Sequence, residues 1–184
     1  MVGLVGVTGL AGSGKTTAIE ELLKLSGGRI LYLGQTVIDE VRARGLQETR
    51  ENERQVRIDL RREKGPSALA IPYIGLVAYC FERGVPVFVD AILTRGEFDV
   101  LAGGVPSGCA RLLAIEASFD IRSARLVSRP ERPITVHELR ERDKTELEGL
   151  GTGAVVESAE HAILNEGTLE QLYRQLAAFV DACG

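Results

Sequence analysis

The residues best suited to chemistry form a glycine-rich octapeptide near the start of the chain. It matches the pattern G-x-x-x-x-G-K-[ST] and consists of Gly9, Leu10, Ala11, Gly12, Ser13, Gly14, Lys15 and Thr16. Glycines let backbone N–H groups turn inward and approach phosphate oxygens closely. A helix that starts at the end of such a loop adds a dipole that favours anions. The octapeptide therefore predicts a loop that binds the phosphates of a nucleoside triphosphate.

Two side chains of this loop have predicted roles of their own. We expect Lys15 to bridge the β- and γ-phosphates and the Thr16 hydroxyl to ligate Mg²⁺. The motif requires a strand before the loop and a helix after it, and residues 2–8 and about 15–25 have the matching patterns. The alternative, a glycine-rich turn with one exposed lysine, is disfavoured by this context.

A third candidate is Asp90, which follows the apolar run VPVFV. A carboxylate at the end of a strand is placed to hold Mg²⁺, directly or through water, or to lie near an acceptor hydroxyl. An aspartate there can also be a solvated residue or a helix cap. With a phosphate-binding loop in the same chain, we favour the functional interpretation.

Five short apolar runs must position these residues. They cover residues 2–8, 29–33, 86–92, 110–116 and 161–165. Continuous apolar cores are typical of parallel strands that are covered on both faces. Because helical segments alternate with the runs, the sequence predicts an α/β fold with right-handed crossovers.

Local patterns predict where several helices begin and what they bury. Thr135 to Glu138 and Thr168 to Gln171 fit the capping box. The last helix, about residues 168–182, places an apolar stripe on one face, consisting of Leu169, Leu172, Leu176 and Phe179. We expect this stripe to belong to the core.

Two stretches interrupt the alternation of strand and helix. Residues 35–83 have room for three helices, of which the charged part 48–64 is typical of a solvated helix face and the later apolar part contains Pro72, expected to kink or split it. Residues 128–133 read SRPERP, a proline-stiffened loop with two arginines. Both stretches indicate insertions within one domain.

Composition limits the function classes. The 184 residues fit one domain, and 22 basic against 26 acidic residues give a net charge of −4, which argues against non-specific nucleic-acid binding. No apolar run approaches the roughly 20 residues of a membrane helix, and no signal peptide is recognisable. Three scattered cysteines suit a reducing compartment. We therefore expect a cytoplasmic protein without a membrane or nucleic-acid partner; its oligomeric state stays open.

Elimination narrows the phosphate-loop classes. The sequence lacks both N-K-x-D and a D-x-x-G motif after the loop, which excludes a GTPase, and it is short for a mechanical ATPase. What remains is a small kinase that moves the γ-phosphoryl group of ATP to a small acceptor. Such an enzyme must exclude water, and a mobile lid with arginines shields the site and stabilises the transferred charge. Arg125, Arg129 and Arg132 suit that role, although each can also be a surface residue.

The chain resembles the small phosphate-loop nucleotide kinases, such as adenylate kinase and dephospho-CoA kinase. It is more similar to a family of predicted archaeal nucleotide kinases related to dephospho-CoA kinase. The matching stretches are GLAGSGKTT, LGQTVIDEVRARGL, VPVFVDAI, ARLLAIEAS, RPITVHELRERDKTELEGLGTG and AILNEGTLEQL. The resemblance implies a single domain, 1–184, with the three-layer P-loop NTPase fold. Its five-stranded parallel sheet would have the order 2-3-1-4-5, with helical acceptor-binding residues 35–83 and a lid at about 125–142.

The resemblance also implies ATP and Mg²⁺ as cofactors and assigns site residues. The catalytic set is Lys15, Asp90, Arg125 and Arg129, and the Mg²⁺ ligands are Thr16 and Asp90. The nucleotide-binding set is Gly9, Leu10, Ala11, Gly12, Ser13, Gly14, Lys15, Thr16, Thr17, Asn165 and Gly167. Residues 165–167 would form the turn against which adenine packs, mostly through backbone contacts; the same turn can also serve as a strand-to-helix loop capped by Thr168.

The acceptor half departs from the pattern of these relatives. Gln35 and Ile38 stand where the relatives have Asp and Arg, and Leu93 stands where they often have a second Arg. Arg42 and Arg95 are the nearest substitutes, at a different spacing. The leading acceptor is a nucleotide, either a nucleoside monophosphate or a dephospho-CoA-like molecule. Two alternatives stay open: a nucleotide-binding regulatory protein without kinase activity, and a kinase of a non-nucleotide metabolite.

Overall fold

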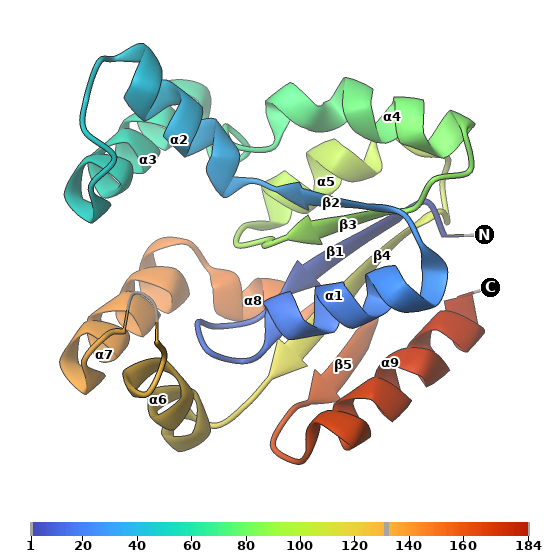
Figure 1. The fold of residues 1–184 in the computed structure, drawn as a ribbon. Helices are drawn as coiled ribbons and strands as arrows, with labels where there is room; N and C mark the ends of the chain where they lie inside the picture. Colours follow the sequence, from blue (N-terminus) through green and yellow to red (C-terminus); the bar gives the residue numbers. More distant parts are fainter. Residues whose placement is uncertain (1, 131–132, 184) are drawn as a thin grey trace.

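A parallel sheet with helices on both faces forms the centre of the protein (Figure 1). The computed structural model describes residues 2–130 and 133–183. Within them the strands are β1 (Leu4–Thr8), β2 (Arg29–Tyr32), β3 (Val87–Asp90), β4 (Ala110–Glu116) and β5 (His161–Leu164). All neighbouring strands are parallel, in the order β2-β3-β1-β4-β5. The predicted fold class is confirmed, and every strand lies inside one of the apolar runs.

The helices connect the strands in the expected alternation. They are α1 (Lys15–Ser26), α2 (Gly34–Ala43), α3 (Arg50–Lys64), α4 (Ile74–Glu82), α5 (Arg95–Ala102), α6 (Phe119–Val127), α7 (Val136–Lys144), α8 (Thr152–Glu157) and α9 (Leu169–Cys183). Two short turns complete them, the 3-10 turn η1 (Ile71–Tyr73) and the π-helical turn η2 (Thr145–Gly149). None of the described helices is long and apolar enough to cross a membrane.

The two faces of the sheet carry separate apolar cores. On one face, Val5 and Val7 of β1 pack with residues of α1 and α9. On the other face, Leu4 packs with residues from the helices between β2 and β4. Successive strand residues point to opposite faces, so a sheet covered on both sides needs apolar side chains at nearly every position. This requirement explains the continuous apolar runs.

The carboxyl ends of the strands all point to one edge of the sheet. The two helical groups α2–α3 and α6–α7 both lie beyond this edge, one on each side of it (Figure 1). Strand β1 has β3 on one side and β4 on the other, so the chain leaves β1 where the strand order reverses. Ligands of open α/β sheets bind at such a switch point. The fold therefore brings the glycine-rich loop, which follows β1, to the expected ligand-binding edge.

Both predicted capping boxes are confirmed. The Thr135 hydroxyl accepts a hydrogen bond from the Glu138 amide at 3.1 Å, and a Glu138 carboxylate oxygen accepts one from the Thr135 amide at 2.6 Å. Thr168 and Gln171 exchange the equivalent bonds at 2.8 and 3.3 Å. Each box satisfies amide groups that have no partner within the helix.

Three local predictions are corrected by the structure. Pro72 lies in η1, directly before α4, instead of interrupting that helix, because proline is favoured in a first helical turn. Leu169 is 59% exposed, since α9 begins there and only later turns reach the sheet. Helix α3 is not only a solvated charged helix, because Val56 and Leu60 are buried in the core.

Candidate nucleotide-binding and catalytic site

The glycine-rich loop joins β1 to α1 through residues that only glycine suits. Gly9, Gly12 and Gly14 have φ values of 133°, 83° and 103°. A Cβ atom at Gly14 would collide with the side chain of Asn165, and one at Gly12 would come within 2.8 Å of Leu126. The loop therefore needs glycine both for its backbone angles and for close approach to its neighbours.

The carbonyl oxygens of the loop all accept hydrogen bonds. Lys15 Nζ donates to the carbonyls of Gly9 at 2.7 Å and Leu10 at 3.1 Å. Arg122 donates to the Ala11 carbonyl at 3.1 Å, and Arg125 donates to those of Gly12 and Ser13 at 3.4 Å each. The Ser13 carbonyl also accepts from the Asn165 side chain at 2.8 Å, and the Gly14 carbonyl accepts from the Ala18 amide at 3.0 Å. Among the loop amides, that of Ser13 donates to the Leu10 carbonyl at 3.2 Å, and we expect the amides that follow it to face the hollow of the loop. Such a nest, continued by the first amides of α1, suits a phosphate group.

The ammonium group of Lys15 lies in a partly buried and electrostatically mixed environment. Burial lowers the pKa of Lys15 from 10.5 to about 8, an effect that the charges of Glu146 and Asp90 oppose and those of Arg142 and Arg122 increase. The charged form is therefore destabilised in the empty loop. An anion bound beside Lys15 would remove that penalty, which makes phosphate a favourable ligand.

Thr16 and Asp90 meet at the floor of the same site. Asp90 ends β3 opposite Val7 of β1, and the Thr16 hydroxyl donates to Asp90 Oδ2 at 3.4 Å. Burial raises the pKa of Asp90, while the positive charge of Lys15 lowers it. Mg²⁺ binds proteins through one or two oxygen side chains together with substrate phosphates. This pair of oxygens fits such a metal, so the chemistry of the donors agrees with the predicted ligands.

The three arginines considered for a lid have different surroundings. Arg125, near the end of α6, donates to the Asn165 carbonyl at 2.9 Å as well as to the loop, so it bridges the loop and the β5–α9 turn. Arg129 is exposed in the segment that follows α6. Arg132 lies outside the described residues. Of these residues, the structure brings Arg125 to the phosphate-binding loop, and the catalytic roles of Arg125 and Arg129 stay predictions.

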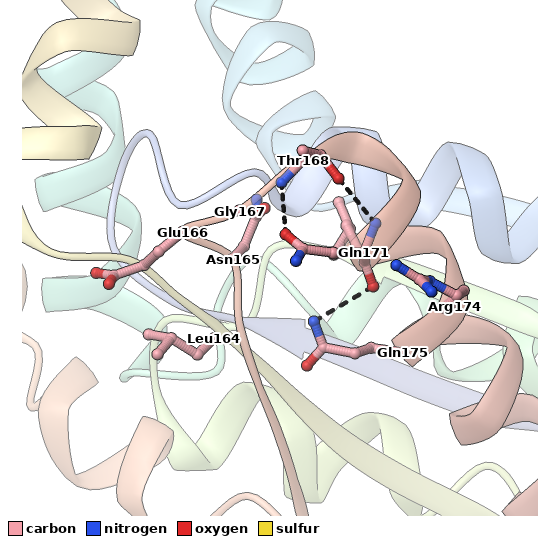
Figure 2. Close-up of a pocket in the computed structure, with 9 residues that line it drawn as sticks. Leu164, Asn165, Glu166, Gly167, Thr168, Gln171, Arg174 and Gln175 are labelled. Atoms are coloured by element: carbon pink, nitrogen blue, oxygen red, sulfur yellow. Dashed lines mark hydrogen bonds between the residues drawn. The ribbon is translucent and has the colours of Figure 1, made fainter.

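The turn at residues 165–167 borders a cavity of about 520 Å³. The side chain of Asn165 is buried and directed at the loop, whereas the turn and the first part of α9 line the cavity (Figure 2). Gln171, Arg174 and Gln175 form its wall on α9. The cavity lies on the turn expected to contact adenine, and that contact stays a prediction for Asn165 and Gly167.

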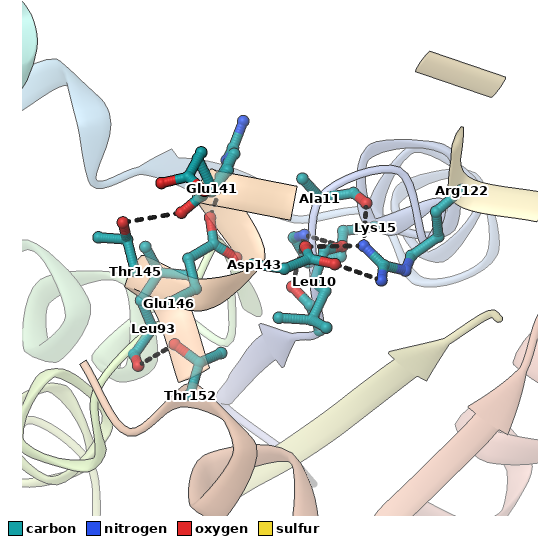
Figure 3. A network of polar contacts seen from close by, with 12 residues as sticks. Leu10, Ala11, Lys15, Leu93, Arg122, Glu141, Asp143, Thr145, Glu146 and Thr152 are labelled. Carbon is teal, nitrogen blue, oxygen red and sulfur yellow. Dashed lines mark hydrogen bonds and ion pairs between the residues drawn. The ribbon is translucent and has the colours of Figure 1, made fainter. Parts of the chain in front are cut away.

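The sequence analysis missed a buried ion pair that supports the loop. Arg122 and Asp143 are only 4% and 8% exposed, and they form two parallel hydrogen bonds of 2.9 and 2.6 Å. Figure 3 shows Arg122 of α6 between the Ala11 carbonyl and Asp143 of α7. The pair thereby attaches α7 to the phosphate-binding loop. Its sequence signal is weak, because the two residues belong to different helices and neither lies in a motif.

A second missed residue is Glu146, in the turn η2. Its side chain is 6% exposed, and its Oε1 accepts a hydrogen bond from Arg142 Nε at 2.7 Å. Its Oε2 is buried without a hydrogen-bond partner among the described residues. Among nearby charges, Glu146 has the largest effect on the pKa of Lys15. Single π-helical turns are frequent at functional sites.

Gln35 and Leu93 stand at acceptor positions where the sequence departs from the relatives, and in the structure both make contacts with uncharged or acidic groups. Gln35 donates to Asp39 at 2.8 Å, and the Leu93 carbonyl accepts a hydrogen bond from Thr152 at 2.9 Å. The expected substitutes pair with exposed acids, Arg42 with Glu48 and Arg95 with Asp99. Neither substitute therefore replaces the missing arginines in an obvious way.

Comparison with known proteins identifies the family of the chain and the solved structures that share its fold. A model of an AAA domain matches residues 5–148. A UPF0200 protein of Thermococcus gammatolerans is 33% identical over 180 residues, covering 97% of this chain and 94% of the relative. Among solved structures, TT1252 from Thermus thermophilus has a TM-score of 0.65 at 21% identity, covering 97% of this chain and 96% of that one. A gluconokinase from Sinorhizobium meliloti has a TM-score of 0.59 at 18% identity, with coverages of 97% and 91%.

Proposed function

The chain belongs to the UPF0200 family and contains an AAA domain, and from this starting point we propose that it is an ATP- and Mg²⁺-dependent phosphotransferase with a small acceptor. The observation that carries the proposal is the meeting of three features at one edge of the sheet. These are a glycine-rich loop whose carbonyls all accept hydrogen bonds, the partly buried Lys15, and the Thr16–Asp90 pair. The fold shared with a gluconokinase supports the same reaction class.

Each group of site residues has its own role in the proposed phosphoryl transfer. The loop amides and Lys15 would hold the β- and γ-phosphates and stabilise the charge that develops on them. Thr16 and Asp90 would hold Mg²⁺, which neutralises phosphate charge when it is bound. The acceptor oxygen forms a bond to the γ-phosphorus while the bond to the bridging oxygen of ADP breaks. Where the acceptor is a hydroxyl, its proton leaves to water or to Asp90, whereas the phosphate oxygen of a nucleoside monophosphate attacks without losing a proton.

We propose a nucleotide as the leading acceptor, either a nucleoside monophosphate or a molecule like dephospho-CoA. Support comes from the resemblance of the sequence motifs to those of nucleotide kinases. The helices α2 and α3 also stand beyond the ligand-binding edge, where an acceptor-binding insertion is expected. A non-nucleotide metabolite is the second candidate. It is favoured by the fold shared with a gluconokinase and by Ile38 and Leu93 at positions where nucleotide kinases have arginine.

Calorimetry and a transfer assay test the proposal together. We expect the purified protein to bind ATP with Mg²⁺ and to release ADP only when an acceptor is added from a panel of nucleotides, dephospho-CoA and sugar acids. Lys15→Ala should lower the transfer rate by orders of magnitude. The matched control is Lys24→Ala, which removes an exposed lysine of the same helix. Absence of ATP binding, or equal rates for the two variants, would refute the proposal.

Binding of ATP without transfer to any acceptor would instead support the regulatory alternative. In that case hydrolysis should be very slow and independent of added acceptors. The acceptor panel therefore separates an enzyme from a nucleotide-binding protein that has lost transfer activity.

A further inference from the structure

A buried carboxylate holds the segment that follows Asp90. Strand β3 ends at Asp90, and residues 91–94 connect it to α5. Glu97, in the first turn of α5, is fully buried, and its Oε2 accepts hydrogen bonds from the amides of Leu93 at 2.9 Å and Thr94 at 3.1 Å. The bond from Thr94 belongs to the capping box of α5. The additional bond from Leu93 extends the contact toward Asp90.

The second oxygen of the same carboxylate binds a residue of another helix. Glu97 Oε1 accepts a hydrogen bond from Arg61 Nη2 at 2.9 Å, and the Arg61 side chain is only 12% exposed. Arg61 belongs to the last turn of α3, 36 residues earlier in the chain. An ionised carboxylate without a partner would be costly at this depth, so the guanidinium is what permits a charged cap here. The ion pair thereby connects α3 to the segment after Asp90.

Two further hydrogen bonds fix the backbone of this segment. The Ile92 amide donates to the Val7 carbonyl of β1 at 2.9 Å. The Thr152 hydroxyl, at the start of α8 and fully buried, donates to the Leu93 carbonyl at 2.9 Å (Figure 3). Residues 92–94 are therefore held from β1, α5 and α8 at once.

The position of this backbone determines where the carboxylate of Asp90 lies. Two residues separate Asp90 from Leu93, and Asp90 Oδ2 lies 3.4 Å from the Thr16 hydroxyl with which it would share a metal. Mg²⁺ demands nearly ideal octahedral geometry with oxygens at about 2.0–2.1 Å, so it tolerates little displacement of a ligand. Capping alone does not require a buried carboxylate, because α7 is capped by the exposed Glu138. The burial and double bonding of Glu97 therefore suit a second task, which is to fix the chain beside the metal ligand.

We propose that Glu97 is a positioning residue of the metal site. It holds the backbone of residues 93–94, and thereby Asp90, in the arrangement that places two oxygen ligands side by side. Arg61 in turn neutralises and fixes the Glu97 carboxylate. The inference rests on the proposed function, because Mg²⁺ and ATP are the ligands that this arrangement serves. Glu97 touches neither of them and acts only through the chain that carries Asp90.

The test measures how much Mg²⁺ strengthens the binding of ATP. Calorimetry with a non-hydrolysable ATP analogue, once with Mg²⁺ and once with a chelator in its place, gives two dissociation constants for each variant. We call their ratio the Mg²⁺ enhancement. It reports the metal site, whereas the metal-free constant reports the phosphate-binding loop. A general loss of stability lowers the fraction of folded protein equally in both titrations, so it cancels in the ratio.

Three variants connect the Mg²⁺ enhancement to the proposed contacts. Glu97→Ala should lower it by about 3- to 10-fold, below the roughly 10- to 100-fold typical of groups that bond a metal ligand directly. Glu97→Gln should keep most of it, because the amide oxygen of glutamine still accepts from residues 93 and 94. Thr152→Val leaves no charge unpaired and frees the Leu93 carbonyl, so it should lower the enhancement as well. The metal-free affinity should be unchanged in all three.

Two controls separate positioning from stability. Glu97→Ala leaves Arg61 buried without its partner, which should lower the unfolding temperature. The double variant Arg61→Met, Glu97→Gln carries neither charge but retains the accepting oxygen, so it should keep the Mg²⁺ enhancement. The matched control is Leu176→Ala, which removes a fully buried side chain on the other face of the sheet. It should lower the unfolding temperature and leave the enhancement unchanged.

Each outcome decides between specific claims. An unchanged Mg²⁺ enhancement in Glu97→Ala, or an equal loss in Leu176→Ala or in the double variant, would overturn the positioning role. If Glu97→Ala fails to fold, Thr152→Val decides in its place.

The same titrations distinguish this inference from the proposed function. A loss of enhancement in Asp90→Asn but in neither Glu97→Ala nor Thr152→Val would leave the metal site standing and refute the inference alone. Full enhancement in Asp90→Asn would refute the metal role of Asp90 and the inference with it. If the analogue fails to bind the wild type, the proposed function itself fails.

Discussion

Replacing Lys15 by methionine should change stability in a way that depends on pH. In the folded protein without ligand, the pKa of Lys15 is lowered from 10.5 to about 8, chiefly by burial. Below pH 8 the lysine is charged in both the folded and the unfolded chain, and the folded state bears the full cost of the buried charge. Between pH 8 and 10.5 the unfolded chain binds more protons, so the stability of the wild type rises with pH. Methionine has no such dependence.

The expected magnitude follows from the difference between the two pKa values. At 1.36 kcal/mol per pKa unit, the folded state of the wild type loses about 3 kcal/mol to this effect at pH 7. At pH 9.5 about 1.4 kcal/mol of that penalty is left. The free energy of unfolding of the wild type should therefore rise by about 2 kcal/mol relative to Lys15→Met between these two pH values.

Urea unfolding at pH 7 and 9.5 measures this difference directly. The comparison cancels other titrating groups, because they are present in both proteins. ATP with Mg²⁺ should have the opposite pH preference, since phosphates favour the charged lysine; its affinity for the wild type should fall above pH 8 and stay flat for Lys15→Met. A stability difference between the two proteins that is the same at both pH values would refute the assignment of a buried, destabilised ammonium to Lys15.

Three further substitutions test separate parts of the site. Arg122→Met leaves Asp143 buried and unpaired, so the free energy of unfolding measured in urea should fall by about 3–5 kcal/mol. A loss below about 1 kcal/mol would contradict the stabilising role of the buried Arg122–Asp143 ion pair. Asp90→Asn should raise the Mg²⁺ concentration for half-maximal transfer by about tenfold without weakening metal-free ATP binding in calorimetry; an unchanged Mg²⁺ requirement would remove Asp90 from the metal site. Gly14→Ala should abolish ATP binding, because its Cβ atom would collide with the side chain of Asn165. The control is Gly45→Ala, because Gly45 also has a positive φ but open space around it. That change should lower the free energy of unfolding by about 1–2 kcal/mol and leave ATP binding intact.

The strands and the phosphate-binding loop were predictable because their signals are local. Each strand is a short apolar run, and the loop joins a motif to the strand–loop–helix context that its chemistry requires. The positions of Lys15, Thr16 and Asp90 follow from strand ends meeting at one edge of a parallel sheet. The order of the strands was an implication of the family resemblance, since apolar runs do not specify which strands pair.

The supporting residues were unpredictable because their roles arise from tertiary packing. Arg122 and Asp143 pair only when α6 lies against α7, and no spacing rule connects them. Helix α3 lies in a stretch whose dense mixed charge is typical of a solvated helix face, yet its residues Val56 and Leu60 are buried in the core. Composition alone does not report such docking.

The hydrogen bonds that hold the carbonyls of the phosphate-binding loop have a kinetic consequence. Since Arg122, Arg125 and Asn165 already hold the carbonyls of residues 11–13, this part of the empty loop is preorganised and loses little conformational entropy when a triphosphate arrives. Association should then be limited by encounter with ATP rather than by loop rearrangement. Changes at Arg122, to which no nucleotide contact is assigned, would slow that association by releasing the Ala11 carbonyl.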